Sequence, residues 1–416
     1  MDNNAIRSTD PILSDLLDKE LKRQRETLAL IASENHVSKS VLQAQGSILT
    51  NKYAEGYPGS RYYGGCEHVD AIEQLAIDRA KEIWNCEYAN VQPHSGTQAN
   101  MGVYFAVLNP GDKILSMSLT HGGHLSHGHP ANFSGRFYEI RHYEVDHSTG
   151  YIDYESMESI AKEFKPDMIV SGFSAYPRIV EWKKFHEVAE DIGAYHLADM
   201  AHITGLVAGG QHPSPMKFSD FVTGSTHKTI RSGRGGIILC DDPDYISKIN
   251  TAVMPGMQGG PLLHNIAGKA AGFAEALTPE FSNYASHVVA NAKSLCNAIS
   301  EGGLKIVSGG TDTHIVLVDL RDSHPDLTGK EVSNLLESVN MVLNANTVPG
   351  ETRSPFLASG IRIGTPAITT RGFTETDCKF VGELIVKMIN NPHEDATKSF
   401  VLNEIKTLCE KYPLYL

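Results

Sequence analysis

Short apolar runs that alternate with helix-length segments constrain the fold of this chain more than any other feature. Apolar runs occupy residues 168–170, 197–198 and 236–240, and residues 157–164 and 183–192 have the periodicity of helices. Strands separated by helices predict a mainly parallel sheet with crossover helices, which is an α/β fold. The carboxyl ends of parallel strands meet at one edge of such a sheet, and ligands bind there.

Four polar residues come after predicted strands and are expected at this edge: Ser95, Ser174, Asp199 and Lys228. Lys228 lies in the run Ser-Thr-His-Lys-Thr, directly after an apolar segment. A partly buried lysine loses its proton readily, so its amine can attack a carbonyl and form a Schiff base. An ordinary solvated lysine at the edge of a loop is the alternative.

Asp199 ends the predicted strand that precedes Lys228, about thirty residues earlier in the chain. Pyridoxal phosphate acts as an electron sink only while its ring nitrogen stays protonated, so an enzyme supplies a carboxylate for that nitrogen and a lysine for the aldehyde. An aspartate and a lysine at the ends of successive strands could supply both contacts. A strand-end aspartate also commonly caps a turn, so the pair indicates this chemistry without establishing it.

Two further motifs have the composition of anion-binding sites. The turn Ser95-Gly96-Thr97 precedes a predicted helix over residues 98–108, where free N–H groups and the helix dipole could hold a phosphate. The same residues would equally serve as a plain helix cap. Arg362 lies between glycines in a predicted strand, and its guanidinium could pair with a substrate carboxylate or form a structural ion pair.

Residues 53–65 interleave glycines with tyrosines around Glu55. The glycines allow close backbone approach and the tyrosines offer flat faces and hydroxyls, which favours a binding loop or a subunit contact. A second segment repeats histidine at short intervals, at His121, His124, His127 and His129. This spacing could bind a metal, but no carboxylate ligand is near in the sequence and no HExxH motif is present. Stacking of an imidazole on an aromatic cofactor is the competing role.

Composition restricts the class of protein further. A length of 416 residues favours two or three domains, and Pro279 is a plausible boundary. The net charge of −13 argues against nucleic acid or an anionic membrane as the main partner. Six scattered cysteines indicate neither a zinc module nor a disulfide framework. No signal peptide or membrane-spanning run is found, so we expect a cytoplasmic protein. Because the histidine segment lacks a metal-binding motif, we also expect no bound metal.

Other catalytic motifs are missing from the chain. There is no GxSxG nucleophile elbow, no GxxxxGK[ST] phosphate loop and no GxGxxG after a strand.

Near the amino terminus, Asp10-Pro11 begins a predicted helix with leucines at near-helical spacing up to Leu28. This helix either packs against another part of the protein or a partner, or is a plain solvent-exposed helix.

With these residues considered together, the chain resembles the serine hydroxymethyltransferase family, which has the aspartate-aminotransferase fold type (fold type I) of pyridoxal phosphate enzymes. The motifs that carry the resemblance span nearly the whole chain and occur in the family's order: LIASEN, NKYAEGYPGSRYYGGCEHVD, NVQPHSGTQAN, THGGHLSHG, DMAH, THKT, GGPL and SGIRIGTPA. The resemblance implies a large domain with a mainly parallel, mixed seven-stranded sheet and a smaller carboxyl-terminal α/β domain. The expected limits are an amino-terminal arm with a dimer contact and an active-site loop (1–60), the large cofactor-binding domain (61–278) and the small domain (279–416).

The resemblance also implies a reaction. The hydroxymethyl carbon of serine would pass reversibly to tetrahydrofolate, giving glycine and 5,10-methylenetetrahydrofolate, with pyridoxal 5'-phosphate bound covalently to Lys228. The site would be shared across an obligate homodimer, with a tetramer possible. Alternatives are an α-methylserine hydroxymethyltransferase, a threonine-type β-hydroxy amino acid aldolase that does not use folate, and a non-catalytic binding protein.

Site residues follow from the matched motifs. The resemblance implies that the cofactor contacts Lys228, Asp199, His202, His124, Ser95, Gly96, Thr97, Ser174, Tyr53 and Gly259. The substrate would contact Arg362, Ser33, Tyr63, Glu55 and His202. The folate would contact Leu119, Gly123, His124, Leu125, Glu55, Tyr62, Asn346, Ser354, Pro355 and Phe356. Catalytic roles would fall to Lys228, Glu55, His227, Asp199, Tyr63 and Thr226, with Tyr53, Glu55, Tyr62, Tyr63 and Gly259 reaching the site from the partner subunit.

Two loops depart from the family's pattern. Ser232-Gly233 stands where the family has Gly-Pro, and this change predicts a looser loop because glycine is freer than proline. Residues 350–352, Gly-Glu-Thr, replace a proline-containing turn. Both loops flank the expected site. The changes in them could alter which substrates are accepted, but they do not change the expected class of reaction.

Overall fold

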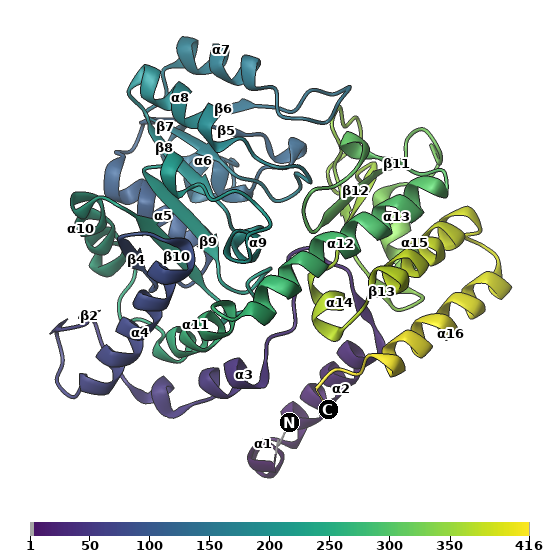
Figure 1. The fold of residues 1–416 in the computed structure, drawn as a ribbon, viewed down its shortest axis with the longest axis horizontal. Coiled ribbons are helices and arrows are strands. Elements are labelled where there is room, and N and C mark those ends of the chain that lie inside the picture. The colour runs from purple at the N-terminus through teal and green to yellow at the C-terminus, as the bar shows by residue number, and fades with distance from the viewer. Residues whose placement is uncertain (1–3, 416) are drawn as a thin grey trace.

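The computed structural model describes residues 4–415, and its larger part is built on a seven-stranded sheet (Figure 1). The strands lie in the order β4-β10-β9-β8-β7-β5-β6. Their bounds are β4 Tyr88–Asn90, β5 Lys113–Met117, β6 Glu139–Tyr143, β7 Met168–Ser171, β8 Tyr195–Asp199, β9 Phe221–Ser225 and β10 Gly236–Cys240. Only β10 runs antiparallel to its two neighbours in this sheet, and the other pairs are parallel. The predicted mainly parallel, mixed seven-stranded sheet is therefore confirmed.

Helices cover both faces of this sheet, and alternate side chains of a strand point to opposite faces. In β7, Met168 and Val170 belong to one apolar cluster while Ile169 belongs to another. Helices α5 and α10 pack on the Met168 side, and α4, α7, α8 and α11 on the Ile169 side. Their bounds are α4 Glu67–Trp84, α5 Gly96–Val107, α7 Tyr154–Phe164, α8 Trp182–Ile192, α10 Pro243–Thr251 and α11 Leu263–Ala276.

A second sheet of four strands forms most of the remaining core. Its order is β11-β12-β15-β14, and every neighbouring pair is antiparallel. The strands are β11 Lys305–Ile306, β12 Ile315–Asp319, β14 Asn344–Asn346 and β15 Gly360–Gly364. They pack with α13 Gly329–Glu337, α15 Glu375–Asn390 and α16 Asp395–Lys411. The resemblance implied a smaller α/β domain here, but not the antiparallel order of its strands.

Helix α12 (Pro279–Glu301) connects the two sheets (Figure 1). Phe281 and Val288, in its first half, belong to the core of the large sheet. Leu295 and Ile299, in its second half, belong to the core of the small sheet. One continuous helix therefore contributes to both cores.

The amino-terminal segment packs with the small sheet. Helix α2 (Pro11–Glu26) begins as predicted, with the Asp10 carboxylate accepting a hydrogen bond from the amide of Leu13. It ends before Leu28, which instead begins β1 (Leu28–Ala29), paired in parallel with β13 (Met341–Val342). The predicted helix up to Leu28 was thus two residues too long. Within this chain the apolar side chains of α2 stay largely exposed, Ile12 by 76%.

The remaining elements are short. They are α1 Asn4–Thr9, α3 Lys39–Gln45, η1 Ile48–Asn51, β2 Gly56–Tyr57, β3 Ser60–Arg61, η2 Leu119–His121, η3 Leu125–His127, α6 Phe133–Phe137, α9 Thr204–Ala208, η4 Met216–Phe218, η5 Ala252–Met257, η6 Val307–Gly309 and α14 Pro366–Arg371. Among residues 4–415 we find no helix with the length and apolar character needed to cross a bilayer.

Candidate active site

Two adjoining cavities open at the carboxyl ends of the large sheet's parallel strands. The deeper one has a volume of about 210 Å³, and the wider one, of about 580 Å³, extends toward the small sheet. Six residues line both cavities: His124, Ser174, His202, His227, Lys228 and Arg234. The predicted edge therefore does gather the polar residues that follow the strands.

Lys228 lies three residues after β9 and is only 8% exposed, so it is not a solvated loop lysine. Burial lowers the pKa of Lys228 to about 8, although the carboxylate of Asp199 opposes this shift. Its backbone carbonyl accepts a hydrogen bond of 3.0 Å from Asn35 Nδ2, and the neighbouring Thr229 hydroxyl donates to the carbonyl of His202. The amine therefore stands on a fixed loop and loses its proton more readily than an ordinary lysine.

Asp199 is the last residue of β8, beside β9, and accepts three hydrogen bonds. Its Oδ2 accepts from Asn100 Nδ2 at 2.8 Å and from His127 Nε2 at 2.9 Å, and its Oδ1 accepts from the amide of Ala201 at 2.9 Å. Burial opposes ionisation, but the bonds from His127 and Asn100 hold the pKa of Asp199 well below its usual range. A carboxylate has about four lone-pair positions, so one remains for a further donor. Asp199 thus caps a turn and still offers an acceptor.

The support around Asp199 was not recognised in the sequence. The Nδ1 atom of His127 accepts a hydrogen bond from the amide of His124, so its Nε2 carries the ring proton. This N–H donates a hydrogen bond to Asp199. Asn100 on α5 is fixed in turn by the hydroxyl of Thr223, 2.6 Å from its Oδ1. The THGGHLSHG motif contained His127, but its partner is more than seventy residues away, so only the fold reveals the contact.

The four clustered histidines diverge in the structure. His124 Nδ1 lies 2.7 Å from the Ser126 hydroxyl, and His127 faces Asp199. His124 borders both cavities, and burial lowers its pKa to about 4. Within residues 4–415, His121 is the one member of the four that belongs to a group of possible metal ligands, and its companions there come from another segment.

The predicted anion turn begins α5 and lines the deeper cavity. The Ser95 hydroxyl caps the helix by accepting the amide of Gln98 at 3.2 Å. A Cβ on Gly96 would stand 2.6 Å from the Ser225 hydroxyl oxygen, so only glycine fits this turn. Below it, the buried amine of Lys269 donates to the carbonyl oxygens of three residues and fixes the strand ends: Val91, Pro93 and Gly236.

Arg234 was also overlooked in the sequence. It is exposed and lines both cavities, where it adds a second cation to the side of Lys228. Its position between glycines after the lysine is the signal that could have identified it, because small neighbours leave a long cationic side chain free to reach a ligand.

Arg362 projects from the middle of β15 into the wider cavity. Its Nη1 donates to the carbonyl of Ser174 at 2.6 Å, and its Nε donates to Asn344 Oδ1 at 3.2 Å. Among residues 4–415 no carboxylate forms an ion pair with it, which excludes the structural ion pair as its partner there. Burial lowers the pKa of Arg362 to about 10, so it remains a cation at neutral pH. The guanidinium can therefore receive a ligand's carboxylate.

Two more histidines lie between the sheets. The His202 and His314 rings stack at 5.6 Å between centroids, and His202 Nδ1 is 3.4 Å from His314 Nε2. Burial lowers the pKa of His202 well below its ordinary value, and it lowers the pKa values of His314 and His227 to about 3. These imidazoles are neutral at pH 7. The Nδ1 atom of His227 is buried without a hydrogen-bond partner.

The wider cavity also gathers several predicted folate residues. The folate residues that line it include Leu119, Gly123, Leu125, Asn346 and Pro355. The predicted substrate residue Ser33 lines it too. The hydroxyl of Thr347 donates to the carbonyl of Thr120 at 3.0 Å, which joins the two sides of this cavity. Ser354 and Phe356 do not line it, and Phe356 is 89% exposed.

The other predicted residues lie away from Lys228 within this chain. A Cβ on Gly259 would be 3.3 Å from Glu55 Oε1 and 3.8 Å from the Tyr53 hydroxyl, so these three residues are neighbours. Tyr53 is 59% exposed and packs edge-on against Tyr63. Tyr62 lines a separate shallow cavity and is 71% exposed. We call Tyr53, Glu55, Tyr62, Tyr63 and Gly259 the exposed tyrosine cluster.

The loop after Lys228 is fixed rather than loose. The amide of Gly233 donates to the carbonyl of Gly268, a bond that proline could not make, and the buried Thr226 hydroxyl donates to the carbonyl of Gly233. The Ser232 hydroxyl donates to the carbonyl of Lys269 at 3.1 Å. The prediction of a looser loop was therefore wrong, because hydrogen bonds replace the stiffness of proline.

In the second departing loop, Glu351 has a comparable role. Its carboxylate accepts hydrogen bonds from the amides of Arg353 and Ser359 and from the Ser359 hydroxyl. These hydrogen bonds hold the loop before β15 in place, at a position where the family has a proline-containing turn.

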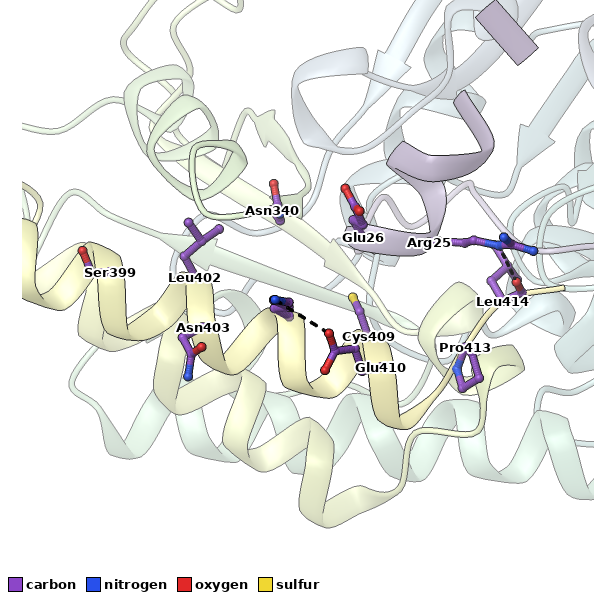
Figure 2. A pocket seen from close by; sticks show the side chains of 11 residues that line it. Arg25, Glu26, Asn340, Ser399, Leu402, Asn403, Cys409, Glu410, Pro413 and Leu414 are labelled. Atoms are coloured by element: carbon purple, nitrogen blue, oxygen red, sulfur yellow. Dashed lines mark hydrogen bonds and ion pairs between the residues drawn. The ribbon is translucent and has the colours of Figure 1, made fainter. Parts of the chain in front are cut away.

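A further cavity, of about 640 Å³, lies elsewhere and contains no predicted site residue. It lies between the end of α2 and α16, where Arg25 donates to the carbonyl of Leu414 (Figure 2). Its walls include Leu402, Cys409 and Pro413. It lies away from the carboxyl ends of the large sheet's strands, so volume alone does not mark the active site.

Comparison with known proteins agrees with this geometry. A model of the serine hydroxymethyltransferase family matches residues 6–385. A serine hydroxymethyltransferase of Haloquadratum walsbyi is 62% identical over 415 residues, covering 100% of both chains, and one of Haloarcula marismortui is 61% identical with the same coverage. One of Crocosphaera subtropica is 52% identical over 410 residues, covering 99% of this chain and 96% of the relative. This chain therefore belongs to the serine hydroxymethyltransferase family.

Proposed function

We propose that this protein transfers the hydroxymethyl carbon of serine reversibly to tetrahydrofolate, giving glycine and 5,10-methylenetetrahydrofolate. The observation that carries the proposal is Arg362, a cation without a carboxylate partner among the described residues, on the same cavity as Lys228. This arrangement suits an amino acid whose carboxylate is held while its amino group lies near the lysine. The family and its relatives favour serine and folate over other amino-acid chemistry.

The deeper cavity fits pyridoxal 5'-phosphate in three respects. The amino terminus of α5 offers N–H groups to a phosphate at a turn that only glycine fits, Asp199 has an acceptor position left for a ring N–H, and Lys228 supplies an amine with a lowered pKa. When bound, this cofactor withdraws electrons from the amino-acid Cα and so permits cleavage of the Cα–Cβ bond. The residues proposed to hold it are Ser95, Gly96, Thr97, His124, Ser174, Asp199, His202 and Lys228.

Residues of this chain set the orientation of the substrate. Arg362 and Ser33 would fix the carboxylate, and a fixed carboxylate determines which Cα bond is presented for cleavage. His227 lines both cavities as a neutral imidazole, so its ring could contact the bound cofactor or substrate. Asn346, Pro355 and Leu125 would border the folate.

The exposed tyrosine cluster is the part of the proposed site that a second chain would complete. Glu55 would move protons during one-carbon transfer, with Tyr53, Tyr62, Tyr63 and Gly259 reaching a neighbouring active site. Their exposure and their distance from the local cavities support an obligate homodimer, and association of two dimers would give a tetramer. A cytoplasmic location remains a prediction from the sequence.

The helix that joins the sheets supports the proposed division of the chain. We place the large domain at residues 61–278 and the small domain at 279–416, with residues 1–60 as an arm. Helix α12 begins at the proposed boundary and connects the two domains, with its first half packed in the core of the large one.

The visible spectrum of the purified protein with glycine, before and after addition of tetrahydrofolate, tests the function. A yellow protein that gains a long-wavelength band with glycine, strengthened by folate, is the expected result. A yellow protein without a folate response would favour the α-methylserine or aldolase reaction. A colourless protein that does not take up pyridoxal phosphate would contradict the role of Lys228.

A further inference from the structure

Outside the active site, one group of side chains has the composition and spacing of a metal centre. It comprises His121 at the end of η2 and Glu144 and His147 just after β6. We propose that these three residues bind a divalent transition-metal ion of the zinc class, with a water molecule at the fourth position. This metal site is independent of the one-carbon reaction.

The distances between the donors favour an ion over direct contact. Glu144 Oε2 lies 3.7 Å from His121 Nε2 and 3.5 Å from His147 Nε2. Hydrogen bonds between charged nitrogen and oxygen atoms are shorter, at about 2.7–2.9 Å. Two ligands on a tetrahedral zinc ion, at bond lengths of about 2.0–2.2 Å, lie roughly 3.3–3.5 Å apart. The two distances from Glu144 are thus close to the ligand spacing on one ion, and the two histidine donors lie within 4.8 Å of each other.

The donor set matches the same class of ion. Two imidazoles and one carboxylate are a common set for zinc that keeps an open coordination position. Hard ions such as magnesium or calcium prefer oxygen ligands throughout, so they fit this set poorly. In residues 4–415 no other trio of histidine, cysteine or acidic side chains comes as close together.

One ligand is buried and another is held by a rigid turn. The His121 side chain is only 7% exposed, and its Nδ1 is buried without a hydrogen-bond partner. His147 lies in a turn where Asp146 Oδ1 accepts the amides of Ser148 at 3.0 Å and Thr149 at 2.8 Å. This turn limits the movement needed for binding. Glu144 and His147 are half exposed, so an ion can enter from solvent.

A glycine lies beside the site. A Cβ added to Gly350 would be 3.4 Å from His147 Nδ1, which is an ordinary van der Waals contact. Gly350 has a φ of +69°, which side chains rarely adopt. The loop at residues 350–352, which departs from the family's pattern, therefore borders the His147 ring.

Binding would add a link between two segments that already meet here, where the amide of Ser118 donates to the carbonyl of Tyr143. His121 directly precedes Gly122 and Gly123, which line the wider cavity, whereas Glu144 and His147 belong to the edge of the large sheet. An ion shared between them would stabilise the wall of that cavity without touching the reacting groups.

The test is the zinc content of the holoenzyme after treatment with a chelator, equilibration with zinc chloride and removal of free metal, without amino acids because they chelate zinc. We expect one zinc ion per chain. The variants His147→Ala and Glu144→Gln should bind zinc at least about tenfold more weakly, since loss of an outer contact alone weakens metal sites by about 10–100-fold. Both side chains are exposed and outside the catalytic cavities, so turnover without zinc should be unchanged.

His186→Ala is the matched control. His186 Nε2 lies 3.9 Å from Glu190 Oε2, which gives a comparable histidine–glutamate pair without a third ligand. This variant should retain zinc as the unchanged protein does, and zinc should raise the melting temperature of both but not of His147→Ala. No zinc in the unchanged protein, or equal retention by His147→Ala and Glu144→Gln, would overturn the proposal and indicate adventitious binding to surface histidines.

Discussion

The cavity around Lys228 and the exposed tyrosine cluster carry the two halves of one proposed reaction, but the chain builds them differently. Lys228 and Asp199 are buried and fixed by neighbours from several strands and helices. Tyr53 and Tyr63 are half exposed and pack edge-on against each other, with Tyr53 also beside Gly259. The difference agrees with the proposal that the exposed tyrosine cluster completes a site on a second copy of the chain.

The largest effect is expected at Lys228. Lys228→Gln should lower turnover at least about 10³-fold, because the amine that holds the cofactor and takes up protons is lost. Steady-state kinetics at saturating cofactor measure the loss, and circular dichroism reports the fold. Lys217→Gln, at an exposed lysine, should behave like the unchanged protein. Near-normal turnover of Lys228→Gln would remove this lysine from the mechanism.

Mixed dimers test whether the cluster acts across the interface. Glu55→Gln and Lys228→Gln should each be nearly inactive, but co-expression should restore about a quarter of the activity, because half of the dimers then contain one intact shared site. The separately tagged and purified mixed dimer is the sample measured, and it should have about half of the unchanged protein's activity because one of its two sites is intact. If the mixed dimer is as inactive as its parents, Glu55 acts within its own chain.

At Arg362 a smaller effect is expected. Arg362→Lys keeps the charge but loses the paired donors, so the KM for serine should rise about 10–100-fold, equivalent to about 1.5–3 kcal/mol for a hydrogen bond to a charged group. Arg141→Lys, on the exposed edge strand, is the control. A KM for serine that stays unchanged while that for folate rises would assign Arg362 to the wrong ligand.

The smallest effect is a shift in pH dependence. Because only the neutral amine attacks an aldehyde, cofactor uptake by the apoprotein should accelerate as pH rises through the pKa of Lys228, about 8, rather than through its ordinary value of 10.5. Absorbance after rapid mixing follows the uptake, and the cofactor's own titration is measured with a small amine. A midpoint near 10.5 would mean that Lys228 is solvated in the apoprotein.

Local sequence patterns predicted part of the large sheet. Strands β7, β8 and β10 are short, apolar and separated from their neighbours by turns or helices, so they could be identified from nearby residues. Strand β6, Glu-Ile-Arg-His-Tyr, has no apolar run and was not predicted. The small sheet was harder, since β11 has two residues and β14 three, and their partners are set by packing. Leu28 continues the leucine spacing of α2, yet β13 draws it into a strand.

The same distinction holds for the candidate site. Lys228, Asp199 and Arg362 have unusual neighbours in the sequence and could be identified individually. His127 and Asn100 look ordinary, because their role depends on a carboxylate contributed by a distant strand. The family resemblance supplied the assignment of residues to a second subunit, which no local pattern could provide.

Helix α12 links the loss of activity to the loss of folded structure when the protein unfolds. Arg362 belongs to the small sheet and Lys228 to the large one, so substrate binding depends on the continuity of the helix that enters both cores. Opening the molecule at this point would break consecutive backbone hydrogen bonds and expose both hydrophobic interiors at once. Denaturant should therefore abolish catalysis and structure in one cooperative transition, with no surviving half that still binds an amino acid.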